Sequence, residues 1–338
     1  MVSSVVANWA VSAASTAVSS LKKAAVLYHY PCPDGAFAAL AAHMYFSAFP
    51  STPALFFPNT VYNPIKPQQL PLHEIDDLYL LDFVGPPGFV QEVSSQVNRV
   101  VVLDHHKTAL ETLGGDSDTA ENVLKVIDMG RSGATIAHDY FKQKLAGNSA
   151  RVKEFERMRR LFEYVEDADL WRWNLPNSKA FSSGLNDLNI EFDVGASPSL
   201  FHQLLSLDLD SVISQGMLSL SHKQKLIDEA LLQSYEIALG GGVFGRCLAV
   251  DADSDLSQLR SELGKQLADK SQKMNLRSIG AIVYRVPEFQ NDELLKISLR
   301  SEGDEDTTSI SQKFGGGGHW NASSFMLSSK EFEQWRVS

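Results

Sequence analysis

Short apolar runs alternate with amphipathic stretches along the first part of the chain. The runs Ala24–Tyr28, Leu78–Leu81 and Val100–Leu103 are aliphatic-rich and short, which predicts buried strands. The stretches Gly35–Phe49 and Pro87–Val97 separate these runs and predict helices. This β-α-β-α order predicts an α/β fold with a mainly parallel sheet.

Two further helices are expected in the middle of the chain. Ser132 can cap a helix that runs to Leu145, and apolar residues spaced by three and four predict another over Val152–Val165. The second helix ends in a group of carboxylates, namely Glu163, Glu166, Asp167 and Asp169. Negative charge at a helix C-terminus opposes the helix dipole, so either a bound cation or an acidic loop facing solvent would explain it.

The pattern changes again near residue 240. Strands are predicted at Val243–Val250, Ile279–Val286 and Leu294–Leu299, with an amphipathic helix over Leu256–Leu267. The chain is therefore expected to contain an N-terminal tail over residues 1–23, a first domain over 24–195, a helical connector over 196–238, and a smaller C-terminal α/β domain over 239–338.

Composition supports two soluble domains. The chain has 338 residues, of which 44% are hydrophobic, so it can bury a core without disulfides. Thirty Lys and Arg against 41 Asp and Glu give a net charge of −11, which provides no basic field for long duplex nucleic acid. No apolar run is long enough for a membrane span, so we expect no membrane partner.

The expected compartment is the cytoplasm. Cys32 and Cys247 lie far apart in the sequence, which fits a reducing environment better than a disulfide framework. The Ser- and Ala-rich residues 1–23 lack acidic side chains but also lack arginine. A targeting segment for an organelle, either a mitochondrion or a plastid, is therefore the alternative.

Polar side chains follow each of the three early strands. They are His29, Cys32 and Asp34 after the first, Asp82 after the second, and Asp104, His105 and His106 after the third. Parallel strands end at a common edge, where ligands of such sheets bind. Carboxylate and imidazole ligands suit manganese, and the central Asp82 could bridge two ions. A lone residue of this kind would more often be structural, but convergence from three strands favours a site.

Basic and glycine-rich segments offer contacts for an anion. Lys107 and Arg131 could approach a phosphate, although each, considered alone, is better explained as a solvated surface charge. Gly315–Gly318 can present successive backbone N–H groups, and His319 follows directly. A flexible loop is the alternative for this glycine run. Trp320 could stack on a base or pack in the core.

Seven motifs in order resemble the DHH phosphoesterase superfamily. They are HYPCPDG, LDF, LDHH, RSGAT, VEDADLW, SLRS and FGGGGH, spread over about residues 24 to 328. The glycine run followed by histidine resembles the C-terminal domain of the RecJ-like and nanoRNase-like branch. The resemblance implies a hydrolase acting on phosphoester bonds, with its active site in the cleft between the two domains.

The same resemblance implies roles for individual residues. His29 and Cys32 would bind one manganese ion, Asp34, His105 and Asp167 would bind the other, and Asp82 would bridge them. Asp104, His105 and His106 would form the catalytic triplet, with His106 facing the scissile phosphate and Asp104 accepting a hydrogen bond from an imidazole. Substrate contacts would come from His106, Lys107, Arg131, Arg300, Gly316, Gly317, Gly318 and His319.

Cys32 departs from the pattern, because many relatives have an aspartate there. Its softer thiolate favours zinc or iron more than a carboxylate would, and a packed thiol with no ligand role is the alternative.

The resulting hypothesis is a phosphodiesterase for short oligonucleotides or dinucleotides that uses two manganese ions, with magnesium or another divalent ion as an alternative. One alternative is a phosphomonoesterase for a nucleotide such as adenosine 3′,5′-bisphosphate. Another is a nucleotide-binding protein that has lost catalysis through Cys32. The sequence leaves a homodimer open.

Overall fold

The computed structural model describes residues 23–113, 120–145, 147–252, 254–286 and 293–337. The predicted tail lies, except for its last residue, outside the described residues. The chain divides into two compact units, Met1–Met217 and Leu218–Ser338, and each is described by itself. Within the described ranges, no helix combines the length and apolar character that crossing a membrane requires.

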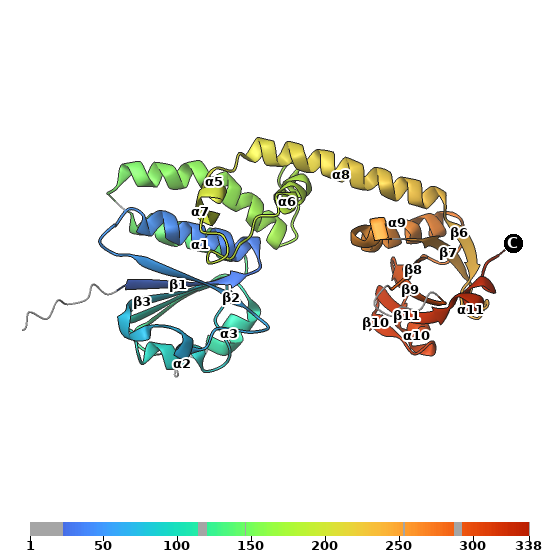
Figure 1. Cartoon of the computed structure of the whole chain (residues 1–338), viewed down its shortest axis with the longest axis horizontal. Coiled ribbons are helices and arrows are strands. Elements are labelled where there is room, and N and C mark those ends of the chain that lie inside the picture. Colours follow the sequence, from blue (N-terminus) through green and yellow to red (C-terminus); the bar gives the residue numbers. More distant parts are fainter. Residues whose placement is uncertain (1–22, 114–119, 146, 253, 287–292, 338) are drawn as a thin grey trace, which may run out of the picture. The chain divides into compact units, whose positions relative to one another are not determined.

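The first unit is built on a parallel sheet, as predicted (Figure 1). Its five strands pair in the order β2-β1-β3-β4-β5, and every pairing is parallel. The bounds are β1 (Lys23–Tyr30), β2 (Ala54–Thr60), β3 (Ile75–Leu81), β4 (Arg99–Asp104) and β5 (Val123–Ile127). The two edge strands, β2 and β5, were not predicted. Pro58 argued against a strand at β2, because proline cannot donate a hydrogen bond to a neighbouring strand and is tolerated at a sheet edge such as this one.

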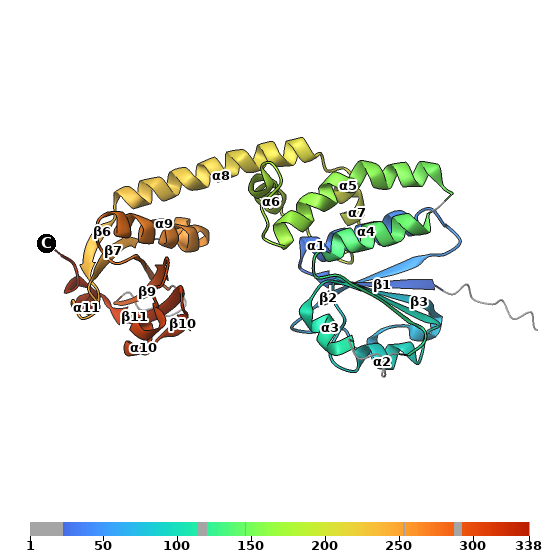
Figure 2. The same cartoon turned by 180° about the vertical axis from the view of Figure 1, so that it is seen from behind.

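Helices cover both faces of this sheet (Figure 2). The helices up to residue 205 are α1 (Pro33–Phe46), α2 (Phe89–Ser94), α3 (Lys107–Leu113), α4 (Gly133–Lys144), α5 (Ser149–Asp169), α6 (Ser178–Asp187) and α7 (Leu200–Leu205), with short 3-10 turns η1 (Pro67–Gln69) and η2 (Leu72–Glu74). One core contains Phe37, Phe141 and Phe162 from α1, α4 and α5. The other contains Val93 and Leu113 from α2 and α3. These two cores fix the strand ends on which the polar side chains stand.

The predicted connector region holds α7, the long α8 (Leu209–Leu232) and β6 (Tyr235–Ala238). The division between the units falls within α8, between Met217 and Leu218.

The second unit contains a mixed six-stranded sheet in the order β10-β11-β9-β8-β7-β6. The remaining bounds are β7 (Arg246–Asp251), β8 (Ile279–Arg285), β9 (Leu294–Ser301), β10 (Gly317–His319), β11 (Ala322–Ser328), η3 (Ser254–Leu259), α9 (Arg260–Lys273), α10 (Thr308–Lys313) and α11 (Ser329–Glu333). The strand predicted from Val243 begins only at Arg246, because Gly240, Gly241, Gly242 and Gly245 have positive φ and form turns. An α/β second domain is confirmed.

Candidate metal centre

The polar side chains predicted at the strand ends lie together in the first unit. His29 is the second-last residue of β1, Asp82 follows β3, and Asp104 ends β4. Three overlapping groups bring candidate ligand atoms within 4.8 Å of one another: Asp82, Asp104, His105 and His106; His29, Cys32 and Asp82; and Asp34, His105 and Asp169. Since Asp82 and His105 each belong to two groups, the three form one continuous cluster.

Asp82 lies at the centre of the cluster and is buried. Its Oδ2 is 3.1 Å from Nδ1 of His29, and its Oδ1 is 3.2 Å from Nε2 of His105. Burial by itself would raise the pKa of this carboxyl, but His105 and His29 together lower it to about 2. The two oxygens thus face different sides of the cluster, as a bridging ligand requires.

The backbone at Asp82 is also unusual. Its φ of 64° is in the left-handed region, which short polar residues such as aspartate tolerate better than most. Strained backbone of this kind is concentrated at functional sites.

Asp34 is held by the N-terminus of α4. Its Oδ2 accepts a hydrogen bond from the Gly133 amide at 2.7 Å, and its Oδ1 accepts one from the Ala134 amide at 3.0 Å. Burial, followed by the charges of Asp82 and Asp169, raises the pKa of Asp34 well above its usual value. Several buried carboxylates in mutual repulsion would be stabilised by a cation.

Asp169, at the end of α5, completes the group with Asp34 and His105. Nε2 of His105 is 3.5 Å from Oδ2 of Asp169 and 3.7 Å from Oδ2 of Asp34. Burial and the charge of Asp82 raise the pKa of Asp169. The structure therefore places Asp169 at the position that the sequence analysis assigned to Asp167.

Asp167 has a different environment, and its assignment as a ligand is corrected. Its two carboxylate oxygens accept hydrogen bonds from the amides of Asn174 at 3.0 Å and Leu175 at 3.2 Å. Its carbonyl accepts one from the amide of Arg172 at 3.0 Å. Burial alone would raise the pKa of Asp167, but hydrogen bonds from Ser178 and these amides lower it. Asp167 thus holds the turn that follows α5.

The two aspartates differ in the direction in which each points from the axis of α5. Asp169 follows Val165 by four residues and Phe162 by seven, so it lies on the side of α5 that carries these two side chains, whereas Asp167, itself buried, follows Tyr164 by three. Glu166 was also missed as a supporting residue. It accepts hydrogen bonds from the amide of Ser132 and the hydroxyl of Thr135, which ties α5 to the start of α4.

The catalytic triplet predicted from the sequence divides into different environments. Oδ1 of Asp104 accepts hydrogen bonds from the amides of His105 and His106 and from Nδ1 of His106, the last at 2.8 Å. This bond is the main reason that the pKa of His106 is raised to about 9. The His106 side chain is 43% exposed, whereas that of His105 is 10% exposed. His106 is therefore anchored at one nitrogen and accessible to a bound molecule.

Cys32 lies beside His29 and Asp82, at the start of α1. Burial, together with the charges of Asp82 and Asp34, raises the pKa of its thiol to about 12. A thiolate at this position would need a cation to stabilise it. Metal ligation by Cys32 stays a prediction.

The residues present fit divalent cations. Their donor set of carboxylates and imidazoles suits manganese or magnesium, with the thiol as a softer addition. Oδ1 of Asp82 is buried and makes no hydrogen bond among the described residues, although His105 lies within ion-pair distance. Buried polar atoms rarely lack a partner, and a metal ion would provide one.

The two predicted cations of the first unit are engaged in contacts away from the cluster. The Lys107 side chain is 80% exposed, and its Nζ lies 3.5 Å from Oε1 of Glu111. Arg131 donates hydrogen bonds to the Thr135 carbonyl at 2.6 Å and to Asp139 at 2.7 Å. Their contact with substrate stays a prediction.

The second unit contains the remaining predicted substrate contacts. Arg300, on β9, donates hydrogen bonds to Ser298 at 3.2 Å and to the Leu299 carbonyl at 2.9 Å. His319 ends β10 and is exposed.

Two amides of the glycine run that was expected to hold an anion donate hydrogen bonds within the second unit. The amides of Gly315 and Gly316 donate to the carbonyls of Gln312 and Ser311, where α10 ends. Gly316 is also needed for packing, because an added Cβ would lie 2.1 Å from the carbonyl oxygen of Ser324. Contacts of Gly316, Gly317 and Gly318 with substrate stay predictions.

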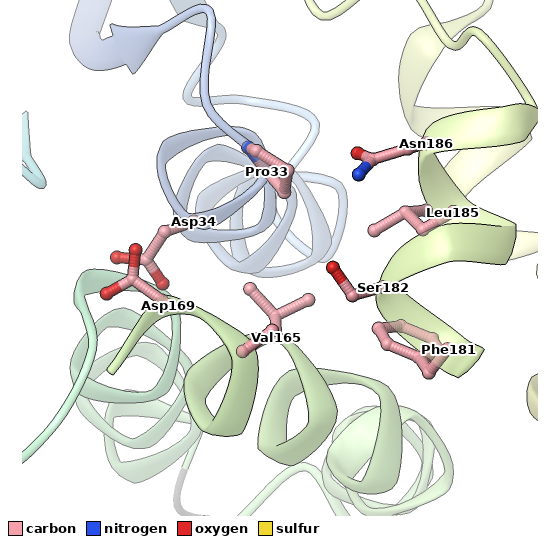
Figure 3. Close-up of a pocket in the computed structure, with 9 residues that line it drawn as sticks. Pro33, Asp34, Val165, Asp169, Phe181, Ser182, Leu185 and Asn186 are labelled. Atoms are coloured by element: carbon pink, nitrogen blue, oxygen red, sulfur yellow. The ribbon is translucent and has the colours of Figure 1, made fainter. Parts of the chain in front are cut away.

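Two pockets adjoin the cluster within the first unit. One has a volume of about 290 Å³, and His29, Asp82, Asp104 and His106 form part of its wall, with largely apolar side chains around them. The other has a volume of about 220 Å³ and adjoins the opposite group of ligands (Figure 3). It is lined by Pro33, Asp34, Val165, Ala168, Asp169, Phe181, Ser182, Leu185 and Asn186.

Comparisons with known proteins give distant similarities. No protein-family model matches the chain. A curated relative, an uncharacterized protein of Acanthamoeba polyphaga mimivirus, is 24% identical over 313 residues, which cover 90% of this chain and 67% of the viral protein.

Two solved structures are also similar. An exopolyphosphatase-related protein from Bacteroides fragilis shares 14% identity with a TM-score of 0.38, over 93% of this chain and 91% of its own. The pGpG-specific phosphodiesterase PggH from Vibrio cholerae shares 11% identity with a TM-score of 0.42, over 93% of this chain and 95% of its own. Because these similarities are distant, the proposed function rests on the side chains of the site.

Proposed function

We propose that this chain is a metal-dependent phosphodiesterase that hydrolyses short oligonucleotides or dinucleotides. The observation that supports the proposal is that two groups of candidate ligands share Asp82. One of them contains His29 and Cys32, and the other contains His105. Divalent cations held by two such groups would lower the pKa of a water molecule and offset charge on the phosphoryl oxygens. Manganese is the proposed ion, because it accepts both carboxylate and imidazole ligands.

The protein's own groups would position the reacting phosphate. His106, anchored through Nδ1 to Asp104, leaves its other ring nitrogen for a phosphoryl oxygen. Asp34 is fixed by the amides of Gly133 and Ala134, so its position does not depend on substrate. Prearranged groups of this kind avoid reorganisation during the reaction.

The expected substrate is short. The net charge of −11 would repel a long polyanion, whereas a substrate with few phosphates can be held by local contacts. We therefore expect a dinucleotide to be hydrolysed faster than a strand of about twenty nucleotides.

A panel of metals and substrates tests the proposal. Dinucleotides, longer strands, cyclic dinucleotides and adenosine 3′,5′-bisphosphate would each be incubated with manganese, magnesium or zinc, and the products identified. We expect mononucleotides from dinucleotides with manganese. Asp82→Asn should lower kcat/KM by about a hundredfold or more, because it removes charge from the centre of the cluster while asparagine tolerates the left-handed backbone.

The matched control is Asp210→Asn, an exposed aspartate in the first turn of α8, which should leave activity unchanged. Phosphate release from the bisphosphate with intact dinucleotides would instead identify a phosphomonoesterase. Binding without turnover in every metal, together with activity gained by Cys32→Asp, would identify a binding protein. Activity that survives Asp82→Asn would contradict the shared-ligand arrangement.

A further inference from the structure

The pocket beside Asp34 and Asp169 has the character of a recognition site. Its wall combines the apolar side chains of Pro33, Val165 and Leu185 with two aspartates of the metal cluster. Figure 3 shows these carboxylates together at one side of the pocket. Small-molecule sites typically combine apolar walls with a few placed polar groups. A molecule in this pocket would therefore be next to a phosphate held at the cluster.

Two polar side chains of α6 supply such groups. Ser182 and Asn186 line the same pocket, one helical turn apart, and Figure 3 shows both on the side that faces Pro33. Across the part of the chain that the structure describes, the hydroxyl of Ser182 and the side-chain amide of Asn186 have no hydrogen-bond partner. Each offers both a donor and an acceptor.

The geometry points to a nucleobase as the occupant: we infer that this pocket holds the base of the nucleotide whose phosphate lies at the cluster, with Ser182 and Asn186 reading its edge. A base has flat apolar faces, which suit Pro33, Val165 and Leu185, and a hydrogen-bonding edge, which suits an amide and a hydroxyl. The inference rests on the proposed function for the attached phosphate. It adds a base preference that the metal cluster itself cannot provide.

The second pocket fits this role less well. Outside the cluster, the polar side chains that line it are those of Asn59 and Thr108. Asn59 is buried, and its Oδ1 already accepts a hydrogen bond from the Ile65 amide at 2.8 Å. Fewer groups remain there to distinguish one base from another.

Kinetics with matched dinucleotides test the inference. The substrates are 5′-phosphorylated homodinucleotides of the four bases and a dinucleotide that lacks bases. We expect the wild type to prefer some bases and to act about tenfold more slowly on the base-free compound. Asn186→Ala and Ser182→Ala should each raise KM and reduce the ratio of kcat/KM between best and worst base by about tenfold, with kcat within about twofold.

Asn63→Ala, an exposed asparagine that lines neither pocket, is the matched control and should preserve the preference. Equal rates on base-free and natural dinucleotides, or a base preference unchanged by both α6 variants, would overturn the inference.

A binding experiment separates this inference from the proposed function. Calorimetric titration with the four nucleoside 5′-monophosphates and ribose 5-phosphate, in the presence of manganese, needs no turnover. Tighter binding of a nucleotide than of ribose 5-phosphate, lost in Asn186→Ala, would support the pocket even if no diester were hydrolysed. Equal binding of all five ligands would overturn it even if hydrolysis were observed.

Discussion

At the scale of single residues, the site depends on which carboxylate faces the cluster. Asp167 and Asp169 are two positions apart at the end of α5, yet one accepts backbone hydrogen bonds and the other faces His105. Charge and residue type are the same for both. Only the phase of the helix distinguishes a structural aspartate from a candidate ligand, because residues two apart point to different sides of a helix.

The two aspartates should respond differently to the same substitution. Asp169→Asn should weaken manganese binding by at least about tenfold and leave the fold intact, because it removes a charged donor. Asp167→Asn should lower the free energy of unfolding by about 1–3 kcal/mol, because an amide cannot accept from both Asn174 and Leu175. Calorimetric titration and thermal unfolding of both variants would measure this. Lost metal affinity with unchanged stability in Asp167→Asn would restore it as a ligand.

At the scale of elements, the start of α4 supports the site as much as the strand ends do. Its first amides hold Asp34, and Gly133 lets the helix approach closely: an added Cβ would lie 2.7 Å from Cβ of Asp82 and 2.9 Å from Oδ2 of Asp34. The negative carboxylate at this end also interacts favourably with the helix dipole. Glycine is thus required at this position of the RSGAT motif because a side chain would clash with the two aspartates.

Gly133→Ala should therefore displace both aspartates. We expect manganese affinity to fall by about tenfold and the free energy of unfolding to fall by about 1–3 kcal/mol, since a methyl group must be forced into a packed site. Metal titration and denaturant unfolding would report the two effects. Gly317→Ala is the control, because a Cβ there would meet no atom within 4 Å. Wild-type manganese affinity in Gly133→Ala would show that the contact is not limiting.

At the scale of the whole molecule, each unit has its own hydrophobic cores. Those of the first unit surround the parallel sheet, and those of the second contain residues such as Ile297 and Leu267. The candidate ligands all belong to the first unit. The expectation that catalysis takes place between two domains stays a prediction.

Manganese should therefore stabilise one part of the chain selectively. In scanning calorimetry of the full chain, we expect a transition of the first unit that rises by about 5–10 °C at manganese concentrations near a hundredfold above Kd, because ligands stabilise the state that binds them. Removing the metal with a chelator should reverse the shift. Asp82→Asn should abolish it, whereas Arg300→Ala in the second unit should not. An equal shift in Asp82→Asn would place the ion elsewhere.

The sequence revealed the strand ends more readily than the supports behind them. His29, Asp82 and Asp104 follow buried apolar runs, so a local pattern was enough to place them at one sheet edge. The partners of Asp34 are about a hundred positions away in sequence, at Gly133 and Ala134, and no local pattern reports such contacts. The edge strand β2 was missed because its proline is tolerated only in a tertiary setting.

The left-handed backbone at Asp82 also limits how this position can change during evolution. Glutamate would keep the charge, but its longer side chain is less suited to that conformation, so the exchange that looks most conservative is disfavoured. Asparagine and glycine fit the backbone easily and carry no charge. Descendants that have abandoned catalysis are therefore expected to drift to one of these two residues, which makes position 82 a useful marker for sorting active from inactive lineages.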